Sequence, residues 1–234
     1  MSWAVPVTVV GLDADDTLWH NEDDFAEAQG GLRELLAPHA EPQLVMRRLD
    51  EIERANLEVY GYGVKGFTLS MIETALELSD GAVPGNQLRE LLEVGKRMLL
   101  RPVELIDGVA DTVERLHRSR RLVMVTKGDL FAQESRIARS GLADAFEAVE
   151  IVSQKDEATY SRVLRRLGVP PREFLMVGNS EVSDVLPVLA LGGWAAHVPY
   201  AVTASFEVPS TPPPPHARRA DLASLTELPD LLGI

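Results

Sequence analysis

Residues 5–17 read VPVTVVGLDADDT, a short and mostly apolar run, rich in β-branched residues, that ends at a cluster of aspartates. Such a run predicts a strand buried on both faces, as in a parallel sheet. Further runs of this kind lie at residues 121–126 (RLVMVT), 148–153 (AVEIVS), 173–178 (EFLMVG) and, shorter, 194–198 (WAAHV). We therefore expect these runs to be the strands of one sheet.

Helical patterns separate the predicted strands, at residues 109–119, 130–140, 156–167 and 183–191. Gly168 and the pair at 192–193 are well placed to end two of these helices. Strands that alternate with helices indicate βαβ units. The fold class predicted for the core is α/β, a doubly wound parallel sheet of Rossmann-like type.

The stretch at residues 23–101 contains helical patterns and no convincing strand. One of its segments carries an approximate apolar stripe made of Leu44, Leu49, Ile52, Leu57 and Val59. A glycine-rich loop at residues 60–66 interrupts the block. A helical block between the first two strands predicts an inserted all-helical cap, so the domains are expected to be 1–22 plus 102–234 for the core and 23–101 for the cap.

Composition excludes several classes of protein. The chain has 234 residues, 45% of them hydrophobic, and no cysteine, so disulfides, thiolate metal sites and a cysteine nucleophile are excluded. A net charge of −13 and a pI near 4.8 disfavour nucleic-acid binding. No basic leader and no membrane-length apolar stretch is present, so a cytoplasmic protein is expected.

The C-terminal part has two predicted features. Residues 208–215 (VPSTPPPP) favour an extended conformation and serve as a spacer more often than as a ligand for another protein. Residues 220–232 (ADLASLTELPDLL) predict a short strand followed by a helix.

The first group of reactive side chains is Asp13-Ala-Asp15-Asp16-Thr17, directly after the first predicted strand. In parallel α/β sheets, ligands bind at this end of the strands. Two carboxylates two residues apart can divide the work of attack and proton transfer, and their oxygens suit Mg2+. Taken alone, the pattern is equally compatible with an acidic turn.

Three further groups follow later strands. Thr126, Lys127 and Asp129 follow the second, and a hydroxyl with backbone N–H groups before a helix suits phosphate oxygens, although helix capping explains them as well. Lys155 follows the third strand, where it either holds a phosphoryl group or is solvated surface. The stretch at 178–184 (GNSEVSD) follows the fourth and offers two oxygen ligands for a metal. All four groups are expected at one edge of one sheet.

In this order the four groups resemble the four motifs of the haloacid dehalogenase-like superfamily. LVMVTKGD at 122–129 resembles its second motif, and residues 153–193 resemble the stretch that holds the third and fourth. The resemblance covers almost the whole chain, and it includes the place of the helical insert.

The resemblance implies a role for each motif residue. Asp13 is implied as the nucleophile that forms an aspartyl-phosphate, and Asp15 as the acid and base. Thr126 and Lys155, with Lys127 beside them, are implied to bind the phosphoryl group. A Mg2+ ion is implied between four ligands, namely Asp13, the Asp15 carbonyl, Asn179 and Asp184. Two anions approach each other only when a cation offsets their charge, which agrees with these roles.

Two positions depart from the pattern of the superfamily. Asn179 stands where an aspartate is usual, so one negative charge is lost and Asp184 gains importance. Asp156 stands where a proline commonly follows the lysine, and it either pairs with Lys155 or starts the helix.

The expected function is a Mg2+-dependent phosphatase that acts on a small phosphorylated metabolite, as a monomer or homodimer with no nucleic-acid or membrane partner. A phosphomutase stays open, as does a non-catalytic protein that binds phosphorylated ligands. A metal-independent 2-haloacid dehalogenase needs no proton donor, so Asp15 disfavours it. A signalling receiver domain is about half as long and lacks the helical insert.

Other side chains received a weaker interpretation. The five histidines show no metal-ligand spacing, and His20, which lies near the proposed site, is better explained by a structural or solvated role. In the cap, Tyr62, Lys65 and Phe67 are either substrate contacts or parts of a helix–helix connection. Asp16 and Asp129 are expected to be hydrogen-bonding loop residues.

Overall fold

The computed structural model describes residues 7–234, so Val5 and Pro6 of the first predicted strand lie outside the described residues. Within that range, one six-stranded sheet has the order β3-β2-β1-β4-β5-β6, and all neighbouring strands are parallel. The strands are β1 Val9–Leu12, β2 Arg121–Lys127, β3 Ala148–Val152, β4 Phe174–Gly178, β5 Trp194–His197 and β6 Arg219–Asp221. The predicted parallel sheet is confirmed.

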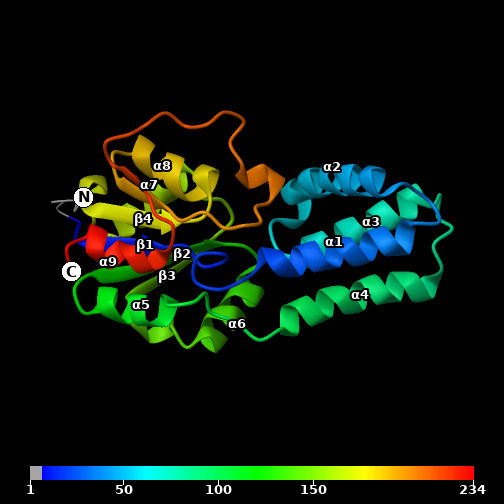
Figure 1. The fold of residues 1–234 in the computed structure, drawn as a ribbon, viewed down its shortest axis with the longest axis horizontal. Helices are drawn as coiled ribbons and strands as arrows, with labels where there is room; N and C mark the ends of the chain where they lie inside the picture. Colours follow the sequence, from blue (N-terminus) through cyan, green and yellow to red (C-terminus); the bar gives the residue numbers. More distant parts are fainter. Residues whose placement is uncertain (1–6) are drawn as a thin grey trace. The chain divides into compact units, whose positions relative to one another are not determined.

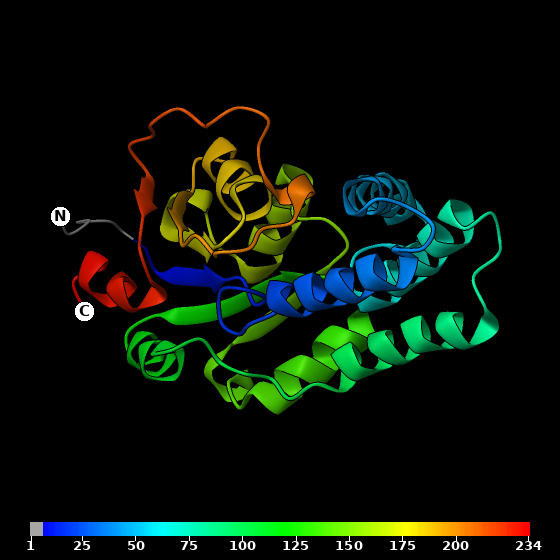
Figure 2. The same ribbon diagram turned by 45° about the vertical axis from the view of Figure 1, so that its right-hand side comes forward.

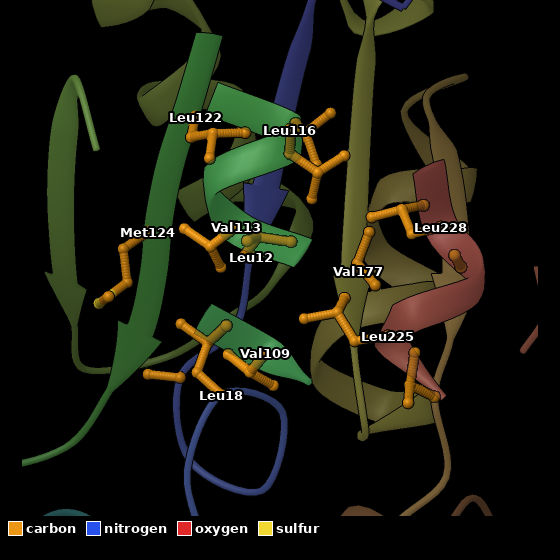
Figure 3. Close-up of a cluster of buried hydrophobic side chains, with 14 of the residues drawn as sticks. Leu12, Leu18, Val109, Val113, Leu116, Leu122, Met124, Val177, Leu225 and Leu228 are labelled. Carbon is orange, nitrogen blue, oxygen red and sulfur yellow. The ribbon is translucent and has the colours of Figure 1, made fainter. Parts of the chain in front are cut away.

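Alternation along the strands explains why the central ones are apolar throughout. Val10 and Leu12 of β1 belong to one hydrophobic cluster, whereas Val9 belongs to a second cluster on the other face. Figure 3 shows the first cluster, in which Val113 of α5 lies among side chains of β1 and β2. Both faces of the sheet are therefore buried, as the unbroken apolar runs require.

Helices cover the two faces of the sheet. α5, α6 and α9 contribute to the cluster on one face, and α7 and α8 pack on the other (Figure 1). Their bounds are α5 Val109–His117, α6 Leu130–Ser140, α7 Glu157–Leu167, α8 Leu186–Ala190 and α9 Leu228–Leu231. Asp156 caps α7 by accepting a hydrogen bond from the Thr159 N–H at 2.7 Å, so it starts this helix, and Gly168 ends it in the left-handed conformation.

The inserted block is entirely helical over α1 Glu22–Leu36, α2 Pro42–Tyr60, α3 Val64–Leu78 and α4 Gly85–Leu100. These four helices pack around a hydrophobic cluster of their own (Figure 2). Chain contacts define two compact units, one with residues 21–102 and 128–132, the other with the rest of the described chain. No helix within residues 7–234 is long and apolar enough to cross a membrane.

The predicted stripe on α2 is only partly right. Leu49 and Ile52 are buried, but Leu44 and Val59 are exposed, and Val45 takes the place expected for Leu44. The set Val45, Leu49, Ile52 keeps the i, i+4, i+7 spacing of a helix face, and the expected set did not.

Candidate active site

Strand order decides where the four motifs meet. The chain runs from β1 outward to β2 and β3, then returns to the other side of β1 for β4. In open α/β sheets, ligands bind outside the carboxyl ends of the strands where the order reverses in this way. Asp13 follows β1 at this point, and Asp184 follows β4.

A buried charged triplet lies at the reversal. Lys155 Nζ donates a hydrogen bond to Asp13 Oδ1 and another to Asp184 Oδ1, the latter at 2.7 Å. Thr17 Oγ1 donates to Asp13 Oδ2 at 3.2 Å. The exposed fraction is 6% for Asp13, 5% for Lys155 and 1% for Asp184, so water screens their charges little. Three residues from three predicted motifs thus form one connected group.

The triplet has one lysine for two carboxylates, which leaves an excess of negative charge. Burial raises the pKa of Asp13 from 3.8 to about 7, opposed by Lys155 and reinforced by the charges of Asp184 and Asp15. Burial by itself lowers the pKa of Lys155, but the two carboxylates outweigh burial, and the net direction is upward. Lys155 therefore stays protonated, while Asp13 shares the single positive charge of Lys155 with Asp184.

Asp184 is fixed by the backbone around it. Its Oδ2 accepts a hydrogen bond from the Ser180 N–H at 3.1 Å. A Cβ at Gly178 would lie 2.2 Å from the same oxygen, so only glycine leaves room for the carboxylate. The segment Glu181–Val185 is a single π-helical turn ahead of α8, where an ordinary helix was expected. Such turns are frequent at functional sites.

Three side-chain hydrogen-bond donors hold the carboxylate of Asp15 in place. Trp19 Nε1 and Arg136 donate to Oδ1, each at 2.7 Å, and Gln133 Nε2 donates to Oδ2 at 2.7 Å. Gln133 Nε2 also lies 2.9 Å from Thr126 Oγ1. The amide of Gln133 therefore connects the first motif to the second.

Asp16 is a hydrogen-bonding loop residue, as expected. Its backbone adopts φ +62°, which is uncommon for a residue other than glycine, and its N–H donates to the Trp19 carbonyl at 2.7 Å. Trp19 is fully buried and so anchors the loop that carries Asp13 and Asp15.

Lys127 points to a different set of partners from Lys155. Its Nζ donates to Ser183 Oγ at 2.9 Å and also pairs with Glu207. The phosphate-binding roles of Thr126, Lys127 and Lys155 stay predictions.

The loop that carries Asn179 is held through its backbone. The Asn179 carbonyl oxygen lies 3.0 Å from His197 Nε2. On its other side the His197 ring faces Glu181 and Asp221, at 3.6 and 3.7 Å. Arg219 donates to both of these carboxylates, at 2.5 and 2.6 Å, and so supplies their counter-charge. Glu181 and Asp221 therefore form an ion-pair network with Arg219.

The site contains further residues that the sequence interpretation did not single out, among them Trp19, Gln133, Arg136, His197 and Glu207. Gln133 and Arg136 have the i, i+3 spacing of one helix face, which was a usable signal. His197 was considered only as a metal ligand, and Glu207 is far along the chain with no pattern around it.

Two of the cap residues proposed as substrate contacts are explained by structural contacts inside their own unit. Phe67 is 2% exposed and packs edge-on against Phe25, with ring centroids 4.8 Å apart. Lys65 pairs with Asp129 at 2.8 Å, and Asp129 also accepts from the Ala132 N–H at 2.9 Å. Phe67 belongs to the helical core, which agrees with the second alternative given for it, a part of a helix–helix connection.

His20 also has a structural contact, because its Nδ1 lies 2.5 Å from the Tyr200 hydroxyl. This agrees with the structural role expected for it.

The donor set fits a divalent cation of the hard type. Asp13 and Asp184 bring two carboxylates together at one buried point with a single lysine between them. Two buried carboxylates that share one lysine carry an excess of negative charge, which a divalent cation would offset. Oxygen ligands of this kind suit Mg2+.

The chain thus has a buried aspartate after the first strand, a lysine after the third and a second carboxylate after the fourth, in an α/β core with an inserted helical block. The model of the haloacid dehalogenase-like hydrolase family matches residues 7–192. The chain belongs to this family.

Solved structures agree with the family assignment. A haloacid dehalogenase-like family hydrolase from Xanthomonas campestris is 39% identical, covers 100% of this chain and 93% of its own, and superposes with a TM-score of 0.87. The putative HAD-hydrolase YfnB from Bacillus subtilis, solved bound to magnesium, is 19% identical over 97% of this chain and 99% of its own, with a TM-score of 0.67.

Other similar structures, 14–21% identical to this chain, include a predicted phosphoglycolate phosphatase and 2-haloacid dehalogenases. Because these proteins have different activities, similarity at this sequence identity shows the fold alone. None of the curated proteins matches the chain.

Proposed function

We propose that the protein is a Mg2+-dependent phosphatase that hydrolyses a small phosphate monoester through an aspartyl-phosphate on Asp13. The observation that carries this proposal is Asp15, a second carboxylate whose orientation is fixed by Trp19, Gln133 and Arg136. Displacement of halide from carbon needs no such group, whereas the alkoxide that leaves phosphorus needs a proton.

The first step is attack of an Asp13 carboxylate oxygen on phosphorus. The bond from phosphorus to the ester oxygen breaks, and that oxygen takes a proton from Asp15. Lys155 and the Thr126 hydroxyl are the groups proposed to hold the phosphoryl oxygens. Lys155 is suited to this because it is a buried cation in contact with Asp13.

In the second step Asp15 removes a proton from a water molecule, whose oxygen attacks phosphorus. The bond to Asp13 breaks, and inorganic phosphate leaves with the aspartate regenerated. Asp15 has then recovered the proton that it donated in the first step. Ser180 and Gly178 keep Asp184 in place throughout.

Asp13, the Asp15 carbonyl, Asn179 and Asp184 are the proposed ligands of Mg2+. When bound, the ion offsets the charge of the carboxylate and the phosphate so that they can approach. Asn179 offers an amide oxygen and no charge, so Asp184 is the acidic ligand of its loop.

The test measures hydrolysis of an aryl phosphate with Mg2+ and after treatment with EDTA, alongside halide release from 2-chloropropionate. We expect phosphate release that EDTA abolishes, no halide release, and no turnover by Asp13→Asn. Asp144→Asn is the matched control, because Asp144 is exposed and precedes β3 at the opposite edge of the sheet. Halide release that survives chelation would establish the dehalogenase instead.

The role of Asp15 has its own test. Asp15→Asn should lose about 10²- to 10⁴-fold with alkyl phosphates, the usual range for general acid–base help, and less with aryl phosphates. Aryl leaving groups are already stable as anions, so they depend less on a proton donor. Equal losses with both substrates would remove Asp15 from this role.

A further inference from the structure

The connection between β5 and β6 brings a carboxylate to the carboxyl ends of the strands, where the candidate active site lies. It is the long loop drawn in orange in Figure 2, and it contains one short turn, Ser205–Glu207. Glu207 accepts hydrogen bonds from Lys127, Ser180 and Ser183. The side chains of Lys127 and Glu207 are only 16% and 11% exposed. A largely buried carboxylate therefore occupies a cluster of donors.

The donors are arranged as a set that receives one anion. Ser183 Oγ donates to Glu207 Oε2 at 2.7 Å and accepts from Lys127 Nζ at 2.9 Å. Ser180 Oγ donates to the same Oε2 and accepts from the Ser183 N–H at 3.0 Å. Lys127 Nζ completes the set by donating to Oε1. Each hydroxyl has its acceptor side occupied, so its proton is directed at the carboxylate.

The strand order of the sheet places these donors near Asp13, the proposed nucleophile. Lys127 ends β2, and Ser180 and Ser183 follow β4. These two strands flank β1, which Asp13 follows, so the Lys127–Ser183 hydrogen bond joins the end of β2 to the turn after β4. Ser183 also precedes Asp184, which shares Lys155 with Asp13.

We propose that Lys127, Ser180 and Ser183 form a second anion subsite next to Asp13, and that Glu207 fills it as a specificity-determining residue. The proposal rests on the phosphatase function proposed above. A substrate whose leaving group carries a carboxylate or a second phosphate would have to displace Glu207 from its three donors. The protein therefore selects phosphate monoesters with an uncharged leaving group.

Anchoring of the loop is the alternative role for Glu207. The loop has other attachments, since Tyr200 contacts His20 at 2.5 Å and Arg218 donates to the Gly192 carbonyl. An anchor would affect all ligands alike, because it acts through the position of the whole loop. A filled anion subsite affects only ligands that carry a second anion, and this difference can be measured.

The experiment measures binding by calorimetry in the presence of Mg2+, with two non-hydrolysable probes of nearly equal size. Phosphonoacetate carries a second anion, and phosphonoacetamide carries a neutral amide in its place. Glu207→Gln should improve the affinity for phosphonoacetate relative to phosphonoacetamide by about tenfold or more, because Lys127 and two hydroxyls become available to the carboxylate. Glu207→Ala should give the same preference, and it replaces the glutamine variant in the experiment if that variant folds poorly.

Two controls separate the subsite from a general charge effect. Glu114→Gln removes an equal charge from an exposed position on α5 and should leave the ratio of the two affinities unchanged. The double variant Lys127→Met/Glu207→Gln should lose the gain, since the subsite cation is gone.

An unchanged ratio in Glu207→Gln and Glu207→Ala overturns the subsite and leaves the phosphatase proposal standing. Failure of both probes to bind any variant contradicts the phosphoryl site itself, and the subsite with it.

Discussion

The raised pKa of Asp13 makes a prediction about stability that needs no substrate. Asp13→Asn replaces a buried carboxylate by a neutral group of nearly the same shape. In the folded metal-free protein the pKa of Asp13 is about 7, against 3.8 for the unperturbed group. The folded state therefore keeps a proton that the unfolded state has lost, and the free energy of unfolding falls as pH rises between these two values. The asparagine variant lacks this dependence.

The magnitude follows from the two pKa values. Between about pH 5 and about pH 8, the wild type should lose about 2–3 kcal/mol of stability through this group alone. The free energy of unfolding of Asp13→Asn, minus that of the wild type, should rise by the same amount over this interval.

The assay is urea denaturation in EDTA at several pH values, read as midpoint and slope for each protein. Asp144→Asn, which removes an exposed carboxylate from the opposite edge of the sheet, should show no comparable change. Mg2+ should reduce the difference at high pH, because a cation that binds ionised Asp13 stabilises the folded wild type. If the difference in the free energy of unfolding does not change with pH in EDTA, the pKa of Asp13 is not raised and the reasoning is refuted.

Three further predictions concern the metal site and the cap. Asn179→Asp should lower the Mg2+ concentration for half-maximal activity, and Asp184→Asn should raise it sharply, because ligand charge sets much of the attraction for a hard cation; an unchanged midpoint in the first variant would mean that Asn179 is not a ligand. Gly178→Ala should weaken Mg2+ binding measured by calorimetry, since its Cβ would lie 2.2 Å from Asp184 Oδ2; unaltered binding would show that Asp184 can move without loss. Phe67→Ala should destabilise the helical unit by about 3–5 kcal/mol in urea denaturation, the usual cost of emptying a large buried site, and a loss below about 1 kcal/mol would contradict its place in that core.

The elements of the core could be predicted from the sequence because their patterns are local. Each central strand is a short apolar run buried on both faces, and each run ends within a few residues of the expected position. The exception within the helices was the segment at 183–191, which begins as a π-helical turn. Hydrophobic periodicity indicates that a helix is present there, but it does not reveal the extra residue of a π-helical turn.

On α2 the error had a different cause. Leu44 and Val59 are apolar, yet both are exposed, and only Leu49 and Ile52 of the expected stripe are buried. Apolar residues occur on protein surfaces, so their identity does not fix the buried face; the neighbouring helices do.

From the sequence by itself, Asp13, Lys155 and Asp184 were expected at one edge of the sheet, because each follows a predicted strand. Tertiary structure alone decided their surroundings. Strand order places β4 beside β1, so Lys155 meets both carboxylates and their burial shifts the pKa of Asp13. It also brings Glu207 to Lys127, 80 residues earlier in the chain. Contacts over such separations depend on the order in which strands are laid into the sheet, and no local pattern of residues encodes that order.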